Sequence, residues 1–358
     1  MFAGRFRRGK KVVEGSPRKK TTDLLARMRK GEFPAAAVAG AFASFADAAF
    51  GAQPASKDTR PADATNPSQA ESPVPQEALE LAFVQSSSLP LRLRQSLSGI
   101  AISANDRVFL LGDGLVHIFE RDGTFVRSWK APDNATCVAV DTNETVYFGV
   151  AGRVEVFSSA GIHKTGFEAG PSDRPAVITA IKAGPKEIFV ADAAARYIVR
   201  FDRNGKRIGE IGSNNKTGGF MLPNRFLDID VDRNGMVAAT DTGRHRVSLW
   251  NLDGTSVRSF GKFGLWHEED FVGCCNPVNL ALAPGGRIVT AEKVVPRVKI
   301  YNSTGKLLGR ISPEHFDSKC IHLHLAVDSI GRIFVADPVR LDVKVFSARG
   351  KSGGSAGV

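Results

Sequence analysis

Apolar and polar positions alternate along most of the chain after about residue 80, and turns rich in glycine, aspartate and asparagine interrupt the alternation. An alternation of period two indicates strands with one buried face, and no helical period of useful length competes with it. The pattern therefore predicts a series of antiparallel meanders and an all-β protein.

One short phrase recurs along this pattern: two or three apolar residues ending in an aromatic, then a few polar residues and a glycine. The aromatic residues are 38, 44, 49, 51 and 45 positions apart, which indicates a repeat array. The six copies run from Val116 to Gly123, Val154 to Gly161, Ile198 to Gly205, Val247 to Gly254, Val298 to Gly305 and Val343 to Gly350.

Each repeat also has the same internal order. An apolar strand and a turn lead to a second strand that closes on Ala-Asp, then come the aromatic-ending strand and a fourth strand after the glycine, as residues 323–346 illustrate for the first three. Four strands in each of six units predict a six-bladed β-propeller of four-stranded antiparallel blades. Because each unit buries its faces only against its neighbours, all six fit one closed ring.

Two segments, 190–205 and 240–254, resemble NHL repeats, whose units read roughly "apolar-Ala-Val-Asp, Gly, Val-Ala-Asp, Arg-Val, Phe-Asp, Gly". The resemblance covers about residues 90–350 and is weaker in repeats one and two. Ala-Asp is replaced at 148–149 and again at 291–292. The resemblance implies a six-bladed propeller, but NHL propellers include binding modules, sensors, lyases and lactonase-like hydrolases, so it implies no single activity.

The two ends of the repeat region suggest how the ring closes. Residues 351–358 contain too much glycine for a fourth strand of the last blade. The strand-like segment 79–84 lies just before repeat one, and we predict that it pairs as the outer strand of that blade. We therefore expect the propeller at residues 79–350 and a flexible tail at 351–358.

Charge is unevenly distributed along the chain, whose net charge is +11. Residues 1–32 hold eleven Lys and Arg against three acids, residues 33–80 hold two against six, and the remainder carries +7. The body is therefore only mildly basic.

Residues 1–78 have the composition of a disordered basic and Ala-rich leader followed by a Pro/Ser linker. The apolar stretch 34–45 is too short to span a bilayer but has the length of a secretory h-region, and residues 46–48 supply a small-x-small site. We predict a signal peptide cleaved near Ala48, export to the periplasm or extracellular space, and a monomer without a transmembrane span. A cytoplasmic Ala-rich leader is the alternative, because the basic region before residue 34 is unusually long.

Alignment of the repeats on their turn glycines places one residue of each innermost strand in a column that faces the central channel. Cys275 and Cys320 align four positions earlier, and Cys320, His322 and His324 share one face of their strand. Cysteine and histidine suit zinc or copper, whereas Asp228 and Asn279 suit calcium. We therefore expect these six residues near a divalent metal at the channel mouth. The full column is Gly99, Cys137, about Ile178, Asp228, Asn279 and His324.

The cysteines leave several interpretations open. Cys275 and Cys320 could form a disulfide between two blades, which export would favour. They could instead fill the crowded inner strands as small side chains, bind a metal, or act as reactive thiols. Cys274 directly precedes Cys275, and adjacent cysteines are awkward to join, so we expect at most one of them to serve the inner cluster.

Glu292 and Lys293 depart from the repeat pattern, and such departures are where function tends to be added. In NHL-like enzymes an arginine near the channel can hold an anionic substrate, so Arg297 joins these two as a candidate binding residue, although it also suits a bond to a neighbouring turn. The aspartates at the Ala-Asp position suit a structural role, because a short carboxylate can accept turn amide hydrogens. They are Asp192, Asp241 and Asp337.

Ordinary hydrolase and nucleotide chemistry has no support, because the sequence contains no Gly-x-Ser-x-Gly elbow, phosphate loop, dinucleotide fingerprint or His-Glu-x-x-His. We predict a non-catalytic NHL-type propeller that binds a protein or small-molecule ligand. One alternative is a metal-dependent lactonase or lyase with Asp228 and Asn279 among its ligands. The other is an RNA-binding propeller, which the body charge of +7 permits without requiring it.

Overall fold

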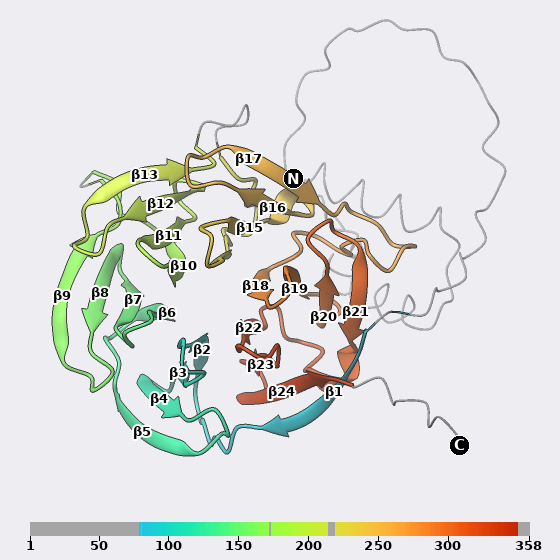
Figure 1. Ribbon diagram of the computed structural model, residues 1–358, viewed down its shortest axis with the longest axis horizontal. Helices are drawn as coiled ribbons and strands as arrows, with labels where there is room; N and C mark the ends of the chain where they lie inside the picture. The colour runs from blue at the N-terminus through green and yellow to red at the C-terminus, as the bar shows by residue number, and fades with distance from the viewer. Residues whose placement is uncertain (1–78, 80, 172, 214–218, 350–358) are drawn as a thin grey trace, which may run out of the picture. The chain divides into compact units, whose positions relative to one another are not determined.

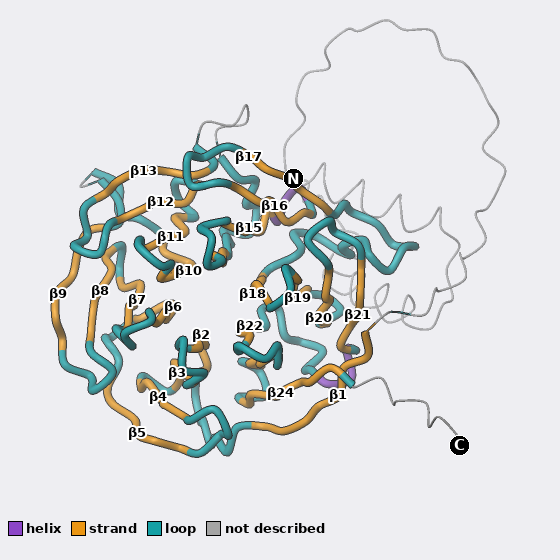
Figure 2. The backbone as a smooth tube through the Cα atoms, in the orientation of Figure 1, coloured by secondary structure: helices purple, strands orange, loops and turns teal. Residues whose placement is uncertain are grey.

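The computed structural model describes residue 79 and residues 81–171, 173–213 and 219–349. Regular structure in these residues consists of strands and two short 3-10 helices, Thr242–Arg244 and Pro313–His315. The strands stand in groups around one axis, as Figure 1 shows, and Figure 2 traces them as orange segments joined by loops. The predicted all-β six-bladed propeller is confirmed.

Each blade contains four strands, and in blades 1 to 5 the strand order follows the sequence from the axis outward, whereas the outermost strand of blade 6 is β1. Blade 1 contains β2 (Leu97–Ile102), β3 (Val108–Gly112), β4 (Leu115–Phe119) and β5 (Phe125–Lys130). Blade 2 contains β6 (Ala135–Val140), β7 (Val146–Val150), β8 (Arg153–Phe157) and β9 (His163–Glu168). Blade 3 contains β10 (Ile178–Ala183), β11 (Ile188–Asp192), β12 (Tyr197–Phe201) and β13 (Arg207–Ile211). Blade 4 contains β14 (Ile229–Val231), β15 (Val237–Asp241), β16 (Arg246–Trp250) and β17 (Ser256–Phe260). Blade 5 contains β18 (Asn279–Ala283), β19 (Arg287–Glu292), β20 (Arg297–Tyr301) and β21 (Leu307–Ile311). Blade 6 contains β22 (His324–Val327), β23 (Ile333–Asp337) and β24 (Asp342–Ala348) together with β1 (Leu81–Ser88).

In blades 1 to 5 the recurring sequence phrase forms the hairpin between the third and fourth strands. In blade 3 the pairing register shifts between Arg200 and Phe201, and Gly205 N donates to Asp202 O at 3.1 Å. Gly205 has a φ of 81°, which glycine adopts without the steric cost of a Cβ. The phrase therefore encodes a bulged hairpin, in which the extra residue lies beside the aromatic position.

The hydrophobic core lies between blades. One cluster of buried residues is shared by each pair of neighbouring blades, including blades 6 and 1. In the cluster between blades 2 and 3, Tyr147 of β7 packs with Phe201 of β12. Each blade is therefore stabilised by its neighbours, and the ring must be closed to bury both faces of every blade.

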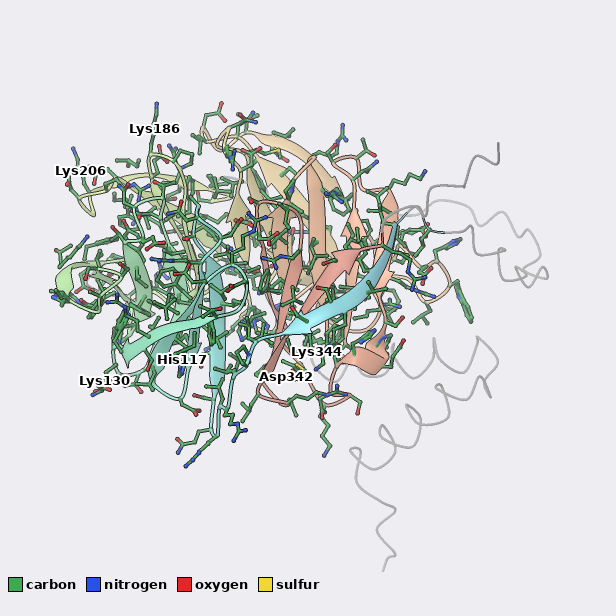
Figure 3. The ribbon with its side chains drawn as sticks, turned by 60° about the horizontal axis from the view of Figure 1, so that its bottom comes forward. His117, Lys130, Lys186, Lys206, Asp342 and Lys344 are labelled. Carbon is green, nitrogen blue, oxygen red and sulfur yellow. The ribbon has the colours of Figure 1, made fainter. Side chains whose placement is uncertain are left out.

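Strand β1 closes the ring. It pairs antiparallel to β24, from Phe83 opposite Ala348 to Ser88 opposite Lys344, and so supplies the outer strand of blade 6. It also pairs in parallel with β21 of blade 5 through Leu81 and Ala82, which joins blades 5 and 6 into one eight-stranded sheet. The strand expected at 79–84 is thus found at Leu81–Ser88, with a second pairing that the sequence did not indicate. Figure 3 shows Asp342 and Lys344 next to each other on β24, where their side chains form an ion pair.

The leader expected at residues 1–78, its cleavage site near Ala48 and the tail expected at 351–358 lie outside the described residues, so export stays a prediction. In the part of the chain that the structure describes, no helix is long and apolar enough to cross a bilayer.

Candidate functional site

A small cavity of about 60 Å³ lies near the starts of the innermost strands. Because all six blades contribute to its lining, the cavity lies on the propeller axis. The blade 3 position is held by Ala180 and not by Ile178, since Ala180 pairs with Ala191 as Cys137 pairs with Gly149 in blade 2. The column residues that line the cavity are Gly99, Cys137, Ala180, Asp228, Asn279 and His324.

Asp228 and Asn279 join neighbouring blades. The amide of Leu280 in blade 5 donates to Asp228 Oδ2 at 2.8 Å, and the amide of Leu325 in blade 6 donates to Asn279 Oδ1 at 2.9 Å. Burial raises the pKa of Asp228 to about 7, although the ammonium of Lys182 opposes this shift. Asp228 Oδ2 and Asn279 Oδ1 are therefore already bonded to backbone amides, and these are oxygens that a metal ion would need as ligands.

Two threonines form further hydrogen bonds between neighbouring blades around the axis. Thr136 Oγ1 donates to Ile178 O at 2.9 Å, and Thr179 Oγ1 donates to Leu227 O at 2.6 Å. Each bond crosses from one blade to the next. Sequence reasoning missed both threonines, although they directly precede the column residues Cys137 and Ala180.

His322 and His324 lie side by side in the axial cavity. Their ring centroids are 4.5 Å apart, and the His322 ring lies 3.8 Å from that of Phe226 in the loop leading into blade 4. Burial lowers the pKa of His324 to about 4 and lowers that of His322 well below its usual value. Both imidazoles are therefore neutral at pH 7, and His322 Nδ1 has no hydrogen-bond partner among the described residues.

Of the interpretations left open for Cys275 and Cys320, the disulfide is not found, because both thiols are free, and neither residue lines the axial cavity. Cys320 packs with Phe316 and Leu323 in the core between blades 5 and 6, and burial raises its pKa to about 12. Cys275 instead lies next to Cys274, with 2.9 Å between the two sulfurs. At most one of these two cysteines was expected to serve the inner cluster, and neither of them lines the axial cavity.

The six predicted metal ligands do not form one site. Within the described residues, no group of three or more His, Cys, Asp or Glu side chains is placed to hold a metal ion. Asp228 and Asn279 bond to backbone amides, and the two cysteines lie away from the two histidines in the cavity lining. The repeat alignment failed for the cysteines because it assumed leading loops of one shape, whereas Cys275 has a φ of 61°.

Glu292 is an internal anchor and not an exposed binding group, since it is 1% exposed. Arg297 Nε lies 3.0 Å and Lys299 Nζ 2.7 Å from Glu292 Oε1, while the amide of Val272 donates to Oε2 at 3.0 Å. Of the three predicted binding residues, Glu292 and Arg297 therefore hold the loop before blade 5, and Lys293 is partly exposed beside them.

The aspartates at the Ala-Asp position have the predicted structural role. Asp192 Oδ1 accepts from the amides of Ala194 and Ala195 at 2.9 and 3.1 Å, and Asp337 Oδ1 accepts from the amide of Val339 at 2.9 Å. Asp241 instead accepts from the amide of Met221 in the loop leading into blade 4, and it pairs with Arg244 and Arg246, which lie in and just after its turn. These carboxylates order the turns between the second and third strands.

We call the end of the propeller where the innermost strands end the C face, and it contains a wider cavity of about 570 Å³. Several carboxylates line this cavity, but they are already bonded. Asp106 accepts two bonds from Ser329 of blade 6, and Asp141 pairs with Arg203 of blade 3. The wider cavity is therefore framed by contacts between blades.

The opposite end, where the innermost strands begin, is called the N face. It is built from the loops that lead into the innermost strands and from the turns between second and third strands. In blades 4 to 6 each leading loop is tied to the turn of its own blade, for example by Gly243 N donating to Met221 O at 2.8 Å. His245 Nε2 also lies 2.8 Å from Gly273 O, which links blade 4 to blade 5.

Exposed large apolar side chains gather on the N face of blades 4 to 6, and we call this group the apolar rim. Trp266 is 71% exposed and Ile321 is 72% exposed. Since exposed apolar groups of this size mark binding surfaces more often when they are clustered, the rim is a candidate site. Its members are Met221, Phe263, Trp266, Val294, Val295, Ile321 and Val339.

Basic side chains of the body are spread over the surface. Figure 3 shows Lys130 apart from Lys186 and Lys206 on the periphery of the propeller. Arg107 is neutralised by Glu120 at 2.6 Å, and other arginines form similar pairs. This distribution gives the RNA-binding alternative no basic stripe that a nucleic acid could follow.

No protein-family model matches the chain, and no curated protein matches it. Among solved structures the chain is similar to a catalytically inactive virginiamycin B lyase from Staphylococcus aureus with quinupristin, at 12% identity over 74% of this chain and 99% of that one, with a TM-score of 0.54. It is also similar to a streptogramin B lyase (13% identity, 76% and 100% coverage, TM-score 0.51) and to the WD40 β-propeller domain of Doa1 (15%, 75% and 98%, 0.50). These likenesses show a β-propeller fold alone, and membership of the NHL family stays a prediction.

Proposed function

We propose that this propeller is a non-catalytic binding module whose apolar rim binds an apolar segment of a partner protein. The observation that carries the proposal is that all seven exposed apolar side chains of the rim lie on loops of one face in three consecutive blades. Burial of a large apolar side chain contributes about 1.5–3 kcal/mol, so two or three such contacts supply useful affinity. Trp266 is the expected centre, because tryptophan is enriched among the residues that dominate binding energy.

The charges on the same loops favour a partner with acidic residues beside the apolar segment. The exposed basic side chains there are Arg225, Lys262, Lys319 and Arg340, against the exposed acids Glu269 and Glu314. Such complementarity mainly speeds association and selects the partner.

The rim is also mechanically suited to binding, because its loops are fixed. Lys299 Nζ donates to Asp270 O at 2.5 Å, and Tyr301 OH donates to Glu269 O at 2.8 Å, so the loop that carries Trp266 is held from below. A preordered surface loses less conformational entropy on binding. The lactonase or lyase alternative has no comparable support, since its expected ligands Asp228 and Asn279 accept hydrogen bonds from the backbone amides of Leu280 and Leu325.

The test is to select peptides from a random displayed library on the purified protein and to measure their binding by fluorescence anisotropy. We expect apolar sequences with acidic residues, and we expect Trp266→Ala and Ile321→Ala each to weaken binding at least about tenfold, or ~1.4 kcal/mol. Ile330→Ala is the matched control, because Ile330 is 60% exposed on the C face. Peptides that are insensitive to both rim variants, or that depend on Ile330, would overturn the proposal.

A further inference from the structure

Two adjacent thiols lie in the loop that leads into blade 5. The sulfurs of Cys274 and Cys275 are 2.9 Å apart, and Cys274 is exposed whereas Cys275 is 3% exposed. Adjacent Cα atoms are about 3.8 Å apart, below the usual 4.4–6.8 Å of a disulfide, so neighbouring cysteines can bond only when the backbone turns both side chains to one side. The left-handed conformation of Cys275, with a φ of 61°, accomplishes this turn.

The loop is fixed on both sides of the pair. Asn276 is fully buried, its Nδ2 donates to the carbonyls of Val272 and Lys293, and its Oδ1 accepts from the amide of Lys293 at 2.9 Å. Val272 is bonded in turn to Glu292. The two sulfurs are therefore held together by the surrounding blade, so the loop ends need not move for them to react.

The geometry points to a redox modification site: a low-molecular-weight disulfide such as oxidised glutathione converts Cys274 and Cys275 into a vicinal disulfide while Cys137 and Cys320 remain thiols. The exposed sulfur of one member and the buried sulfur of the other give the pair an attacking and a resolving thiol.

The reaction proceeds in two exchanges. The Cys274 thiolate attacks one sulfur of oxidised glutathione, which forms a mixed disulfide and releases one glutathione thiolate. Cys275 then loses its proton to solvent and attacks the Cys274 sulfur, which releases the second glutathione. The two cysteines lose two electrons and two protons, and the oxidant becomes two molecules of glutathione thiol. Burial raises the pKa of Cys275 to about 12, which is consistent with Cys274 reacting first.

The other two thiols are separated from this chemistry. Cys137 lines the axial cavity and Cys320 lies in the core between blades, and both are buried. Burial raises their pKa values to about 11 and about 12. Because an attacking thiol must be both accessible and deprotonated, neither competes with Cys274 for the oxidant.

The test treats the full-length protein with oxidised glutathione under native conditions, blocks free thiols after denaturation, and maps tryptic peptides by mass spectrometry. Peptide 263–287 contains Cys274 and Cys275 as its only cysteines. We expect this peptide to lack two hydrogens and to resist alkylation, with Cys137 and Cys320 fully alkylated. A cross-link between peptides 263–287 and 320–332, a stable glutathione adduct on wild-type Cys274, or four unmodified thiols would each overturn the inference.

Two variants separate the steps. In Cys275→Ser the resolving thiol is missing, so one glutathione should remain attached to Cys274, and in Cys274→Ser no adduct should form. Cys320→Ser is the control, because it should still form the vicinal bond. If Cys275→Ser folds poorly, the rate of Cys274 alkylation by iodoacetamide in the wild type, before and after oxidation, still decides the outcome: alkylation that is unchanged by oxidation contradicts the inference.

Discussion

The carboxylate of Asp228 in blade 4 accepts a hydrogen bond at 2.8 Å from the backbone amide of Leu280 in blade 5, inside the axial cavity. Asp228 was expected as a metal ligand, but through this contact it joins two blades. A second oxygen on the same strand does likewise, since Leu282 N donates to Asp230 Oδ2 at 2.8 Å. The inner strand of blade 4 is therefore held to blade 5 by two carboxylates.

The stability of the propeller should depend on pH through Asp228. Its pKa of about 7 exceeds the ordinary 3.8 because the side chain is buried, so the folded state binds the proton more tightly. The contribution of this group to the free energy of unfolding is highest below pH 4 and falls as pH rises from 4 to 7. Asp228→Asn keeps an acceptor without the charge, so relative to the wild type it should gain on the order of 3 kcal/mol between pH 4.5 and pH 8.

Urea denaturation at several pH values measures this difference. Asn279→Ala is the control, because it removes the equivalent bond to Leu325 without removing a titrating group. A difference between wild type and Asp228→Asn that stays constant with pH would show that Asp228 does not titrate in this range.

The turn glycines should be sensitive to substitution for two separable reasons: the left-handed backbone conformation, and the space that a Cβ would need. Gly205 has a φ of 81°, and a Cβ there would lie 2.6 Å from the Phe167 ring of blade 2. Gly114 has a φ of 71°, but a Cβ there would meet nothing within 4 Å. Gly205→Ala should therefore lower the free energy of unfolding by about 2–4 kcal/mol, and Gly114→Ala by only about 1 kcal/mol.

Thermal and urea unfolding of the two variants give these values directly. Equal losses would mean that backbone strain alone matters, and that the turn does not pack on the preceding blade.

Local sequence patterns were sufficient to predict the fold because each blade repeats the same hairpin. The aromatic-to-glycine phrase fixes the bulged turn, as in Phe201 to Gly205, and the spacing of the phrase gives the number of blades. The alignment based on it also brought Cys137 and Asp228 to one cavity, since the innermost strands share a register.

The site was less predictable, because its residues lie on loops and in pairs that differ from blade to blade. The position of Cys275 depends on Glu292, which bonds to Val272 from another part of the chain. The alternation along β20 predicts that Lys299 lies on the polar side of the strand, yet its side chain is fully buried and pairs with Glu292. Neither contact has a local sequence signal, and the apolar rim is visible only when its loops are placed on one face.

The buried pair of Glu292 and Lys299 makes a further prediction. Glu292→Ala leaves the Lys299 ammonium 0% exposed without its ion-pair partner, which should cost about 3–5 kcal/mol of unfolding free energy. Lys299→Met should cost less, because Arg297 still neutralises Glu292 at 3.0 Å. Burial lowers the pKa of Lys299 to about 8 from the ordinary 10.5, although Glu292 opposes this shift, so the unfolded state binds the proton more tightly.

The wild type should therefore gain stability from this group as pH rises from 8 to 10.5, and Lys299→Met should lose that gain. Urea denaturation of the wild type, both single variants and the double variant measures the coupling energy between the two residues. Glu292→Ala combined with Lys299→Met should be more stable than Glu292→Ala alone, because the uncompensated charge is gone. If the two losses simply add, the ammonium of Lys299 does not depend on Glu292, and the leading loop of blade 5 is held by its other contacts.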